Sequence, residues 1–435
     1  MDAAALARRT TYWALDRAHG RPVAEAVDEI HAALDDPHDP EVRRLLDTRL
    51  AALLLHAVER VPFYRGSDPT DLTTFPVVTK LTFREHGPAM RSRGFAAAAL
   101  QPHVTSGSTG TPFEAVWDQG KALRNRADTI AMATRAGYRL GMPLIYFRIW
   151  GGAYRKGPVQ RAREGLTPVD VRSLDDGRAR EVLDAVRRRR HPVTLLGYTS
   201  ALELLCHVLD AGHPGVADRV AAVVAVGEAP TDYLRRAAER HFGTPLVARY
   251  SNSENGLVAQ EEPGSTGYRV NRASYLVEVL RHDSDRPAGA GEEGRIVLTD
   301  LFNRAMPFIR YDTGDRGTLA VDGGGRADDA VLASIAGRSM ATVYDTRGRS
   351  LNPMGFMELS RFTDVRQFQV AQTGPGRYTL RLNASPDAGR DTQIRAQLLD
   401  ALGADADLVI TYVEEVPLLA SGKRQVVVNE WQSAH

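Results

Sequence analysis

The stretch that decides the fold runs from Val220 to Arg249 and reads VAAVVAV GEAP TDYLRRAAERHF GT PLVAR. Its first seven residues are an unbroken apolar run, which predicts a buried strand over Val220–Val226. After the turn GEAP, the pattern predicts a helix over Thr231–Phe242 and a second strand over Pro245–Arg249. Strands and helices that alternate at this spacing are typical of a parallel α/β sheet, in which ligands bind at the carboxyl ends of the strands.

The same alternation extends toward the N-terminus. The predicted elements there are a strand over Leu144–Trp150, a helix over Ala179–Arg190, a strand over Val193–Leu196 and a helix over Ser200–Ala211. Residues 1–60 are predicted to be helical, because apolar residues recur with helical spacing through Val23–Leu34 and Glu41–Arg60.

The pattern changes after about residue 265. Short strands over Val277–Leu280, Gly294–Thr299 and Arg316–Val321 predict a β-rich subdomain, and 322–329 is predicted to be a turn or disordered loop. Beyond Gly337 the sequence predicts a hairpin of Gln367–Thr373 and Arg377–Asn383, a helix over Asp391–Leu402 and a strand over Leu408–Val413. We therefore expect an α/β fold: a large N-terminal domain (1–336) with parallel sheets, helices and a β-rich subdomain, and a small mobile α+β C-terminal domain (337–435).

Composition excludes several classes of function. The 435 residues are 43% hydrophobic and carry a net charge of +1, which gives no electrostatic basis for binding nucleic acid or an anionic membrane. Cys206 is the only cysteine and lies in an apolar run, so core packing is favoured over a nucleophile. The sequence has no apolar run of membrane-spanning length and no signal-peptide pattern, which predicts a cytoplasmic protein.

The octapeptide TSGSTGTP at Thr105–Pro112 combines two glycines with five hydroxyls. Backbone N–H groups exposed in such a turn form a cradle for phosphate. It is not a Walker A loop, because no Gly-Lys-Ser/Thr follows, and a polar solvent loop is the alternative. The candidate phosphate-binding residues are Thr105, Ser106, Gly107, Ser108, Thr109 and Gly110.

Other motifs follow this loop in a fixed order. They are Gly227-Glu228-Ala229-Pro230, Tyr250-Ser251-Asn252-Ser253-Glu254, Arg310-Tyr311-Asp312-Thr313-Gly314-Asp315, Gly337-Arg338 and Ser421-Gly422-Lys423. The series resembles the adenylate-forming superfamily of acyl-CoA synthetases and adenylating enzymes. The chain is most similar to the phenylacetate–CoA ligase-like branch, which includes capsule-biosynthesis proteins, and Phe75-Pro76-Val77-Val78-Thr79-Lys80 matches that branch as well.

The resemblance implies that a carboxylate attacks the α-phosphate of ATP, giving an acyl adenylate and pyrophosphate. Two anions must meet in this reaction, so the site has to neutralise charge and position the groups. Glu254 is then the Mg²⁺ ligand, with a helix-start carboxylate as the alternative. ATP is assigned to Tyr250, Ser251, Asn252 and Ser253 beside adenine, to the backbone of Gly227, Glu228, Ala229 and Pro230, and to Asp315 at the ribose.

Three cations complete the implied site. Lys423 is the predicted catalytic residue, because its long stem can bring a point charge to the carboxylate and α-phosphate oxygens. The scarcity of lysine favours a functional role for Lys423, because the chain has only four lysines: Lys80, Lys121, Lys156 and Lys423. Arg338 is assigned to the ribose or α-phosphate, and Arg310 is a second candidate. A surface ion pair is the alternative for either arginine.

The acid and the acceptor are less defined. Aromatic residues at Tyr146, Phe147, Trp150 and Tyr198 suggest an aryl or short apolar acid, with ordinary core packing as the alternative. The acceptor implied first is a thiol, of CoA or of the phosphopantetheine on a carrier protein. An amine acceptor and a catalytically inactive nucleotide-binding scaffold remain open alternatives. Ser339-Met340-Ala341 departs from the family hinge, where Asp or Lys often follows the Gly-Arg pair.

Overall fold

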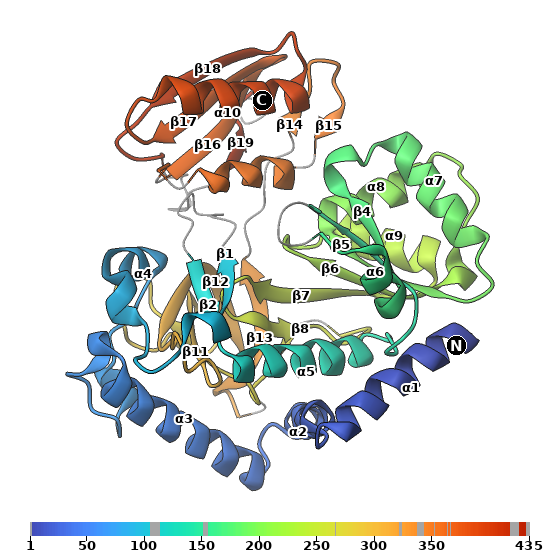
Figure 1. The fold of residues 1–435 in the computed structure, drawn as a ribbon. Helices are drawn as coiled ribbons and strands as arrows, with labels where there is room; N and C mark the ends of the chain where they lie inside the picture. Colours follow the sequence, from blue (N-terminus) through green and yellow to red (C-terminus); the bar gives the residue numbers. More distant parts are fainter. Residues whose placement is uncertain are drawn as a thin grey trace. The chain divides into compact units, whose positions relative to one another are not determined.

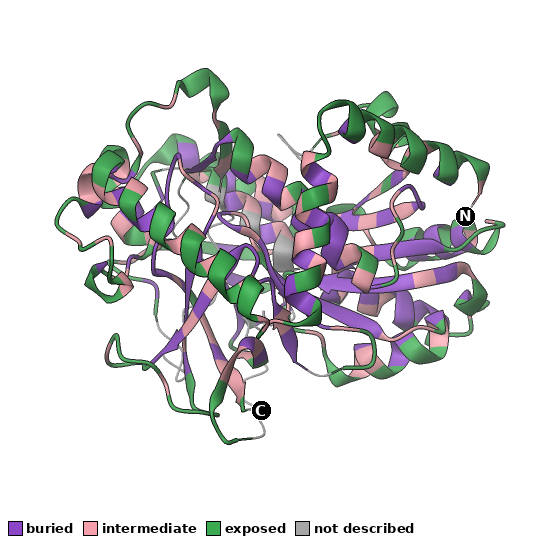
Figure 2. Cartoon of the chain, turned by 90° about the horizontal axis from the view of Figure 1, so that it is seen from below, coloured by how far each residue is buried: buried purple, intermediate pink, exposed green. Residues whose placement is uncertain are grey.

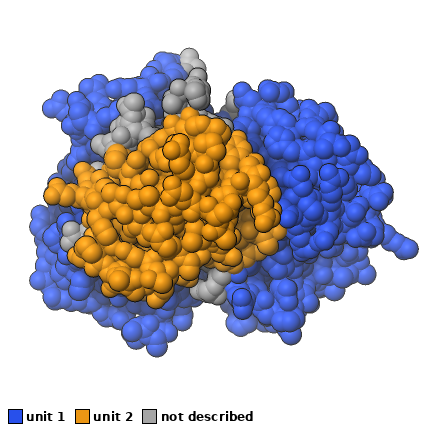
Figure 3. All heavy atoms as spheres, turned by 90° about the horizontal axis from the view of Figure 1, so that it is seen from above, with its two compact units in different colours: residues 1–103, 115–169, 174–337 blue, residues 104–114, 170–173, 338–435 orange. Residues whose placement is uncertain are grey.

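The computed structural model describes residues 2–104, 114–150, 155–265, 267–321, 324–336, 343–351, 353–362, 364–365, 367–417 and 426–431 (Figure 1). The chain divides into two compact units, which Figure 3 colours separately. Unit 1 comprises Met1–His103, Ala115–Val169 and Leu174–Gly337, and unit 2 comprises Val104–Glu114, Asp170–Ser173 and Arg338–His435. Within the described ranges, every helix is too short or too polar to cross a membrane.

Unit 1 begins with three helices that start at a cap or a proline. The side chain of Asp2 accepts a hydrogen bond from the backbone N–H of Ala5 (2.6 Å), and Pro22 and Pro40 fill first-turn positions where no N–H is needed. These helices are α1 (Ala3–Ala18), α2 (Pro22–Asp35) and α3 (Pro40–Arg60), as the sequence predicted. The other helical segments of unit 1 are α4 (Lys80–His86), α5 (Gln119–Arg135), α6 (Pro158–Glu164), α7 (Asp176–Arg187), α8 (Thr199–Asp210), α9 (Asp232–Phe242), and the 3₁₀ turns η1 (Pro62–Tyr64), η2 (Leu72–Thr74), η3 (Gly87–Met90), η4 (Ala97–Ala99) and η7 (Ala217–Arg219).

The large sheet contains eleven strands among the described residues, in the order β10-β11-β12-β13-β9-β8-β7-β6-β5-β3-β4. Strands β3, β5, β6 and β7 are parallel, and from β7 to β10 neighbouring strands are antiparallel. The strands are β3 (Leu144–Arg148), β4 (Leu166–Asp170), β5 (Val193–Tyr198), β6 (Val220–Val226), β7 (Leu246–Asn252), β8 (Gly256–Gln260), β9 (Tyr268–Val270), β10 (Tyr275–Leu280), β11 (Glu293–Asp300), β12 (Tyr311–Val321) and β13 (Ala327–Ala336).

The parallel half confirms the predicted strand–helix alternation. Its strands are buried, while the outer faces of the helices around them are exposed (Figure 2). Capping sets the helix starts, since Asp175 accepts from the N–H of Arg178 (2.8 Å) and Thr231 accepts from that of Leu234 (3.1 Å). Gly243 ends α9 with φ +68°, a conformation that glycine adopts without strain.

The β-rich part differs from the prediction in two ways. Its strands continue the parallel sheet, because β7 pairs with β8 over Asn252↔Gly256 and beyond. The predicted loop over 322–329 is wrong for 327–329, where β13 begins and Ala327 pairs with Val321 of β12. Strand pairing there outweighed the Gly and Asp content that had indicated a loop. A separate hairpin pairs β1 (Gln101–Val104) with β2 (Glu114–Trp117).

Unit 2 has a four-stranded sheet in the order β18-β17-β16-β19. Its predicted hairpin is confirmed by antiparallel pairing of β16 with β17. The predicted helix over Asp391–Leu402 starts earlier, because Asp387 accepts from the N–H of Arg390 (2.7 Å) and caps it. The elements are β14 (Val343–Tyr344), β15 (Ser350–Leu351), η8 (Pro353–Arg361), β16 (Gln367–Gly374), β17 (Arg377–Asn383), α10 (Ala388–Leu402), β18 (Asp407–Tyr412) and β19 (Val427–Asn429); η6 (Val171–Ser173) also falls in this unit.

Candidate active site

The carboxyl ends of β5, β6 and β7 bring two of the predicted motifs to one edge of the sheet (Figure 1). Tyr198 at the end of β5 pairs with Val226 of β6, and Val226 pairs with Arg249 of β7. The turn that begins at Gly227 and the segment that begins at Tyr250 therefore start side by side. This edge is where a parallel sheet binds its ligands.

Glu254 is buried just beyond the end of β7. The indole Nε1 of Trp117 donates to its backbone carbonyl (2.6 Å) and fixes its position. Its Oε1 accepts a hydrogen bond from the hydroxyl of Tyr311 (2.7 Å) and lies 3.0 Å from Lys80 Nζ. Burial acts to raise the pKa of this carboxyl, but Lys80 and Tyr311 outweigh it and lower the pKa. Glu254 is therefore ionised at neutral pH.

Lys80 reaches Glu254 because the segment before it is attached to β12. The N–H of Val78 donates to the carbonyl of Arg310 (3.0 Å), and the N–H of Asp312 donates to the carbonyl of Val78 (2.8 Å). Thr79 then caps α4, so that Lys80 occupies its first turn. Lys80 is not among the residues predicted from the sequence for this site. The scarcity of lysine in this chain was the one signal that could have identified it.

Tyr250 and Asp315 meet across the sheet. The hydroxyl of Tyr250, from β7, donates to Asp315 Oδ2 (3.0 Å) and lies 3.2 Å from Thr313 Oγ1. Thr313 in turn donates to the carbonyl of Ile296 (3.0 Å) and accepts from the N–H of Asp315 (3.1 Å). The structure thus brings together the residues predicted for adenine and for ribose. Asp315 is half-buried, and a carboxylate is the type of group that accepts hydrogen bonds from a diol.

The turn after β6 depends on Gly227 and Glu228. Gly227 has φ +80°, and a Cβ there would lie 3.0 Å from the ring of Tyr198. The Glu228 carboxylate accepts from the N–H (2.8 Å) and hydroxyl (3.2 Å) of Ser200 at the start of α8. Burial raises the pKa of Glu228 despite these bonds. The side chain of Glu228 therefore secures α8, and its backbone carbonyl accepts a hydrogen bond from the hydroxyl of Thr199 (3.0 Å) in the same helix.

The guanidinium of Arg310 contacts other residues than those of the two centres at Glu254 and Asp315. Its guanidinium forms an ion pair with Glu278 (Nη2 to Oε1, 3.2 Å) and donates to the carbonyl of Phe75 (3.3 Å). It has φ +48°, in the left-handed region that non-glycine residues rarely adopt. These contacts favour a structural role, in which Arg310 joins β10 to the segment that carries Lys80. Its assignment to the nucleotide stays a prediction.

The four aromatic residues predicted to line the acid pocket have different surroundings. Phe147 is fully buried and packs on Gly197, whose added Cβ would lie 2.6 Å from that of Phe147, so its position is that of a core residue. The rings of Tyr146 and Trp150 meet edge to face at 5.6 Å, and Trp150 Nε1 donates to the carbonyl of Tyr146 (3.0 Å). Burial raises the pKa of Tyr198 to about 12.

Several predicted residues lie outside the described part of the chain. They are the phosphate loop Thr105, Ser106, Gly107, Ser108, Thr109 and Gly110, the arginine Arg338, the hinge Ser339-Met340-Ala341 and the lysine Lys423. Their assignments stay predictions. Ser251, Asn252 and Ser253 are described and follow Tyr250, with Asn252 Oδ1 accepting from the N–H of Asn255 (2.7 Å).

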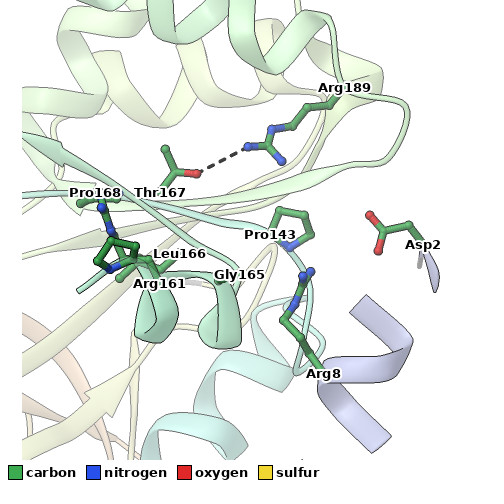
Figure 4. Close-up of a pocket in the computed structure, with 11 residues that line it drawn as sticks. Asp2, Arg8, Pro143, Arg161, Gly165, Leu166, Thr167, Pro168 and Arg189 are labelled. Carbon is green, nitrogen blue, oxygen red and sulfur yellow. Dashed lines mark hydrogen bonds between the residues drawn. The ribbon is translucent and has the colours of Figure 1, made fainter. Parts of the chain in front are cut away.

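A pocket of about 540 Å³ lies elsewhere in unit 1 (Figure 4). Arg8 donates to the carbonyl of Gly141 (2.7 Å) beside it, and Arg189 points toward Thr167 (Figure 4). None of the predicted site residues lines it, and we assign it no function. Its lining residues are Asp2, Arg8, Pro143, Pro158, Arg161, Ala162, Gly165, Leu166, Thr167, Pro168 and Arg189.

Two curated proteins are similar in sequence to part of this chain. No family model matches the chain. The chain is 27% identical over 298 residues to a phenylacetate–coenzyme A ligase of Thermus thermophilus, covering 63% of this chain and 65% of that protein. It is 20% identical over 246 residues to the protein CapK of Staphylococcus aureus, covering 55% and 53%. The matched region thus spans less than two thirds of each curated relative.

Solved structures share the fold over a greater length. A 2-hydroxyisobutyryl-CoA ligase in the thioesterification state, bound to its acyl adenylate and CoA, aligns with a TM-score of 0.59 and 19% identity over 91% of each chain. The same ligase in the postadenylation state aligns with a TM-score of 0.57 and 17% identity, again over 91% of each chain.

Proposed function

From the premise that its relatives and its fold are those of the adenylate-forming superfamily, in the phenylacetate–CoA ligase-like branch, we propose that this chain activates a small carboxylic acid with ATP and transfers the acyl group to CoA. The observation that carries the proposal is the pairing of two centres at one sheet edge. One is the ionised Glu254 beside Lys80, and the other is Tyr250 bonded to Asp315.

In the first half-reaction, an oxygen of the acid attacks the α-phosphorus of ATP and the bond to pyrophosphate breaks. Asp315 accepts hydrogen bonds from the ribose, and Tyr250 holds Asp315 in place while flanking adenine. Lys80 supplies positive charge beside Glu254. Lys423 and Arg338 are proposed to stabilise charge on the carboxylate and the α-phosphate. In the second half-reaction, the thiol sulfur attacks the acyl carbonyl and AMP leaves.

The residues fit a magnesium ion shared with the substrate. Glu254 offers a buried, ionised carboxylate, and no cluster of three acidic, histidine or cysteine side chains within the described ranges forms a complete protein site. Mg²⁺ is commonly held by one or two carboxylates together with substrate phosphates. Glu254 would hold the ion with the phosphates of ATP, and the ion would neutralise their charge.

CoA is the acceptor we favour, because the relative that is 27% identical is named as a coenzyme A ligase. The phosphopantetheine of a carrier protein presents the same thiol, and an amine acceptor would form an amide from the same adenylate. Neither has an observation in this structure that favours it over CoA.

The test is exchange of labelled pyrophosphate into ATP with a panel of carboxylic acids, followed by mass spectrometry of the products formed with CoA. We expect acid-dependent exchange and an acyl-CoA product. Glu254→Gln should lower exchange by roughly 100-fold or more, in the range of losing one preorganised electrostatic contact. Glu164→Gln, in the partly exposed pair with Lys156, is the matched control. No exchange with any acid, together with no ATP binding by calorimetry, would refute the proposal in favour of an inactive scaffold.

A further inference from the structure

Arg249 is a half-buried cation at the same sheet edge as the candidate active site. It is the residue directly before Tyr250 on β7, so alternation along the strand places its side chain on the opposite face from that of Tyr250. Val247, two residues earlier, packs with Val224 and Tyr198 in one cluster, whereas Tyr250 belongs to another. Arg249 therefore extends from the Tyr198 face.

No carboxylate neutralises Arg249 within the described ranges. Its Nε donates to the amide oxygen of Gln260 (3.0 Å), and the Gln260 amide donates to the carbonyl of Met132 on α5 (2.7 Å). Gln260 is neutral, and the two terminal nitrogens of Arg249 have no hydrogen-bond partner in the described part of the chain. Arg235 and Arg310, on other elements of unit 1, are paired with Glu261 and Glu278.

The surroundings of Arg249 are aromatic. Burial lowers its pKa to about 10, against an opposing effect of the nearby Tyr146, so the guanidinium stays charged at neutral pH. Tyr146 also lies beneath the guanidinium of Arg148 (5.4 Å), which contacts the ring of Trp150 as well (5.7 Å). The charge of Arg148 acts to lower the pKa of the Tyr198 hydroxyl, against the larger effect of burial, which raises it. The result is an aromatic region that holds two guanidinium groups, those of Arg148 and Arg249.

A half-buried guanidinium without a counter-ion is costly, because it has lost water and gained no opposite charge. A ligand anion at its terminal nitrogens would offset that cost. The reacting carboxylate is not this anion, since it has to reach the α-phosphate on the side of Tyr250 and Glu254. Arg249 instead suits an anionic group at the opposite end of the acid from the reacting carboxylate.

We propose that the acid activated by this chain carries a second anionic oxygen group, in the first instance a second carboxylate, and that Arg249 binds it between aromatic walls. Arg249 is then a specificity-determining residue, and Gln260 positions it. This inference rests on the proposed function and narrows its substrate class from small carboxylic acids to diacids.

The experiment measures pyrophosphate exchange with matched pairs of acids: succinate against butyrate, glutarate against pentanoate, and homophthalate against phenylacetate. The unmodified chain should prefer the diacid in at least one pair by about 10-fold or more, the range expected for a charged hydrogen bond. Arg249→Met should remove that preference while activity with the monoacid is kept or raised, and Arg249→Lys should restore part of it. Arg178→Met, in an exposed pair on α7, is the control.

Calorimetric binding of the preferred diacid with and without Arg249 gives a second readout that needs no turnover. Exchange that favours monoacids, with a ratio unchanged in Arg249→Met, would overturn the inference and leave the proposed function intact. Absence of both exchange and ATP binding would overturn the proposed function, and this inference with it.

Discussion

Lys80 Nζ lies 3.0 Å from Glu254 Oε1, and the hydroxyl of Tyr311 donates to the same oxygen. Three segments far apart in the sequence thus converge on one carboxylate whose side chain is only 3% exposed. A carboxylate this buried would take up a proton without a partner. Lys80 and Tyr311 keep it ionised, which is the form that the proposed magnesium site requires.

Replacing Lys80 with Met should therefore change the pH profile of the enzyme. Without the lysine, burial dominates and the pKa of Glu254 rises, because the charged form has lost its strongest partner. Exchange activity at pH 7 should fall by roughly 10-fold or more and recover as the pH is raised and Glu254 ionises. The measurement is pyrophosphate exchange between pH 5.5 and 9.

The control for this variant is Lys156→Met, which removes a lysine from a partly exposed pair with Glu164. Unfolding in urea should be followed for both, since breaking a buried pair also costs stability, about 3–5 kcal/mol. If Lys80→Met reduced activity equally at every pH, a role in keeping Glu254 ionised would be disproved.

Asp315→Asn should weaken recognition of the ribose. The amide can still accept a hydrogen bond, but it loses the charge that strengthens bonds to hydroxyls and alters the contact with Tyr250. We expect KM for ATP to rise by about 10-fold, with a smaller change in kcat. The preference for ATP over 2′-deoxy-ATP should shrink in parallel. An unchanged preference would show that Asp315 does not contact the ribose hydroxyls.

Local sequence pattern predicted the parallel half of the fold well, because each of its strands and helices carries its own period and boundary signal. The apolar run at Val220–Val226 and the cap at Thr231 are examples. The pattern failed where pairing decides structure, as at Ala327, whose place in β13 depends on Val321 across the hairpin.

The candidate site was predicted in part. Motifs located Tyr250 and Asp315, which the structure brings together. Lys80 and Arg249 were not assigned roles, because neither the type of a residue nor its spacing shows which side chains it will contact in the folded chain. Only the fold shows that Lys80 meets Glu254 while Arg249 meets the neutral Gln260. Arg310 was a candidate because it lies in the motif that ends at Asp315, and its pairing with Glu278 cannot be read from the sequence.

Gly227→Ala should destabilise the turn that follows β6. Gly227 has φ +80°, which disfavours any side chain, and the added Cβ would lie 3.0 Å from the ring of Tyr198. Gly212 has φ +93° with nothing within 4 Å, so Gly212→Ala is a control that shares the backbone strain but not the contact. Both variants should lose about 1 kcal/mol from strain. Only Gly227→Ala should also lower exchange activity, and equal activities would contradict a role for this turn.

Lys121→Met should measure how much a buried ion pair contributes to the stability of unit 1. Lys121 and Asp300 are fully buried, with Nζ 2.7 Å from Oδ2, and Lys121 also donates to the hydroxyl of Tyr275 (2.8 Å). Removing the lysine leaves a buried, unpaired carboxylate, so the free energy of unfolding should fall by about 3–5 kcal/mol. The double variant Lys121→Met with Asp300→Asn should recover part of this loss, because the uncompensated charge is gone. Urea unfolding measures both, and a double variant less stable than the single one would show that Asp300 acts mainly through the backbone N–H groups of Phe302 and Asn303 that it accepts from.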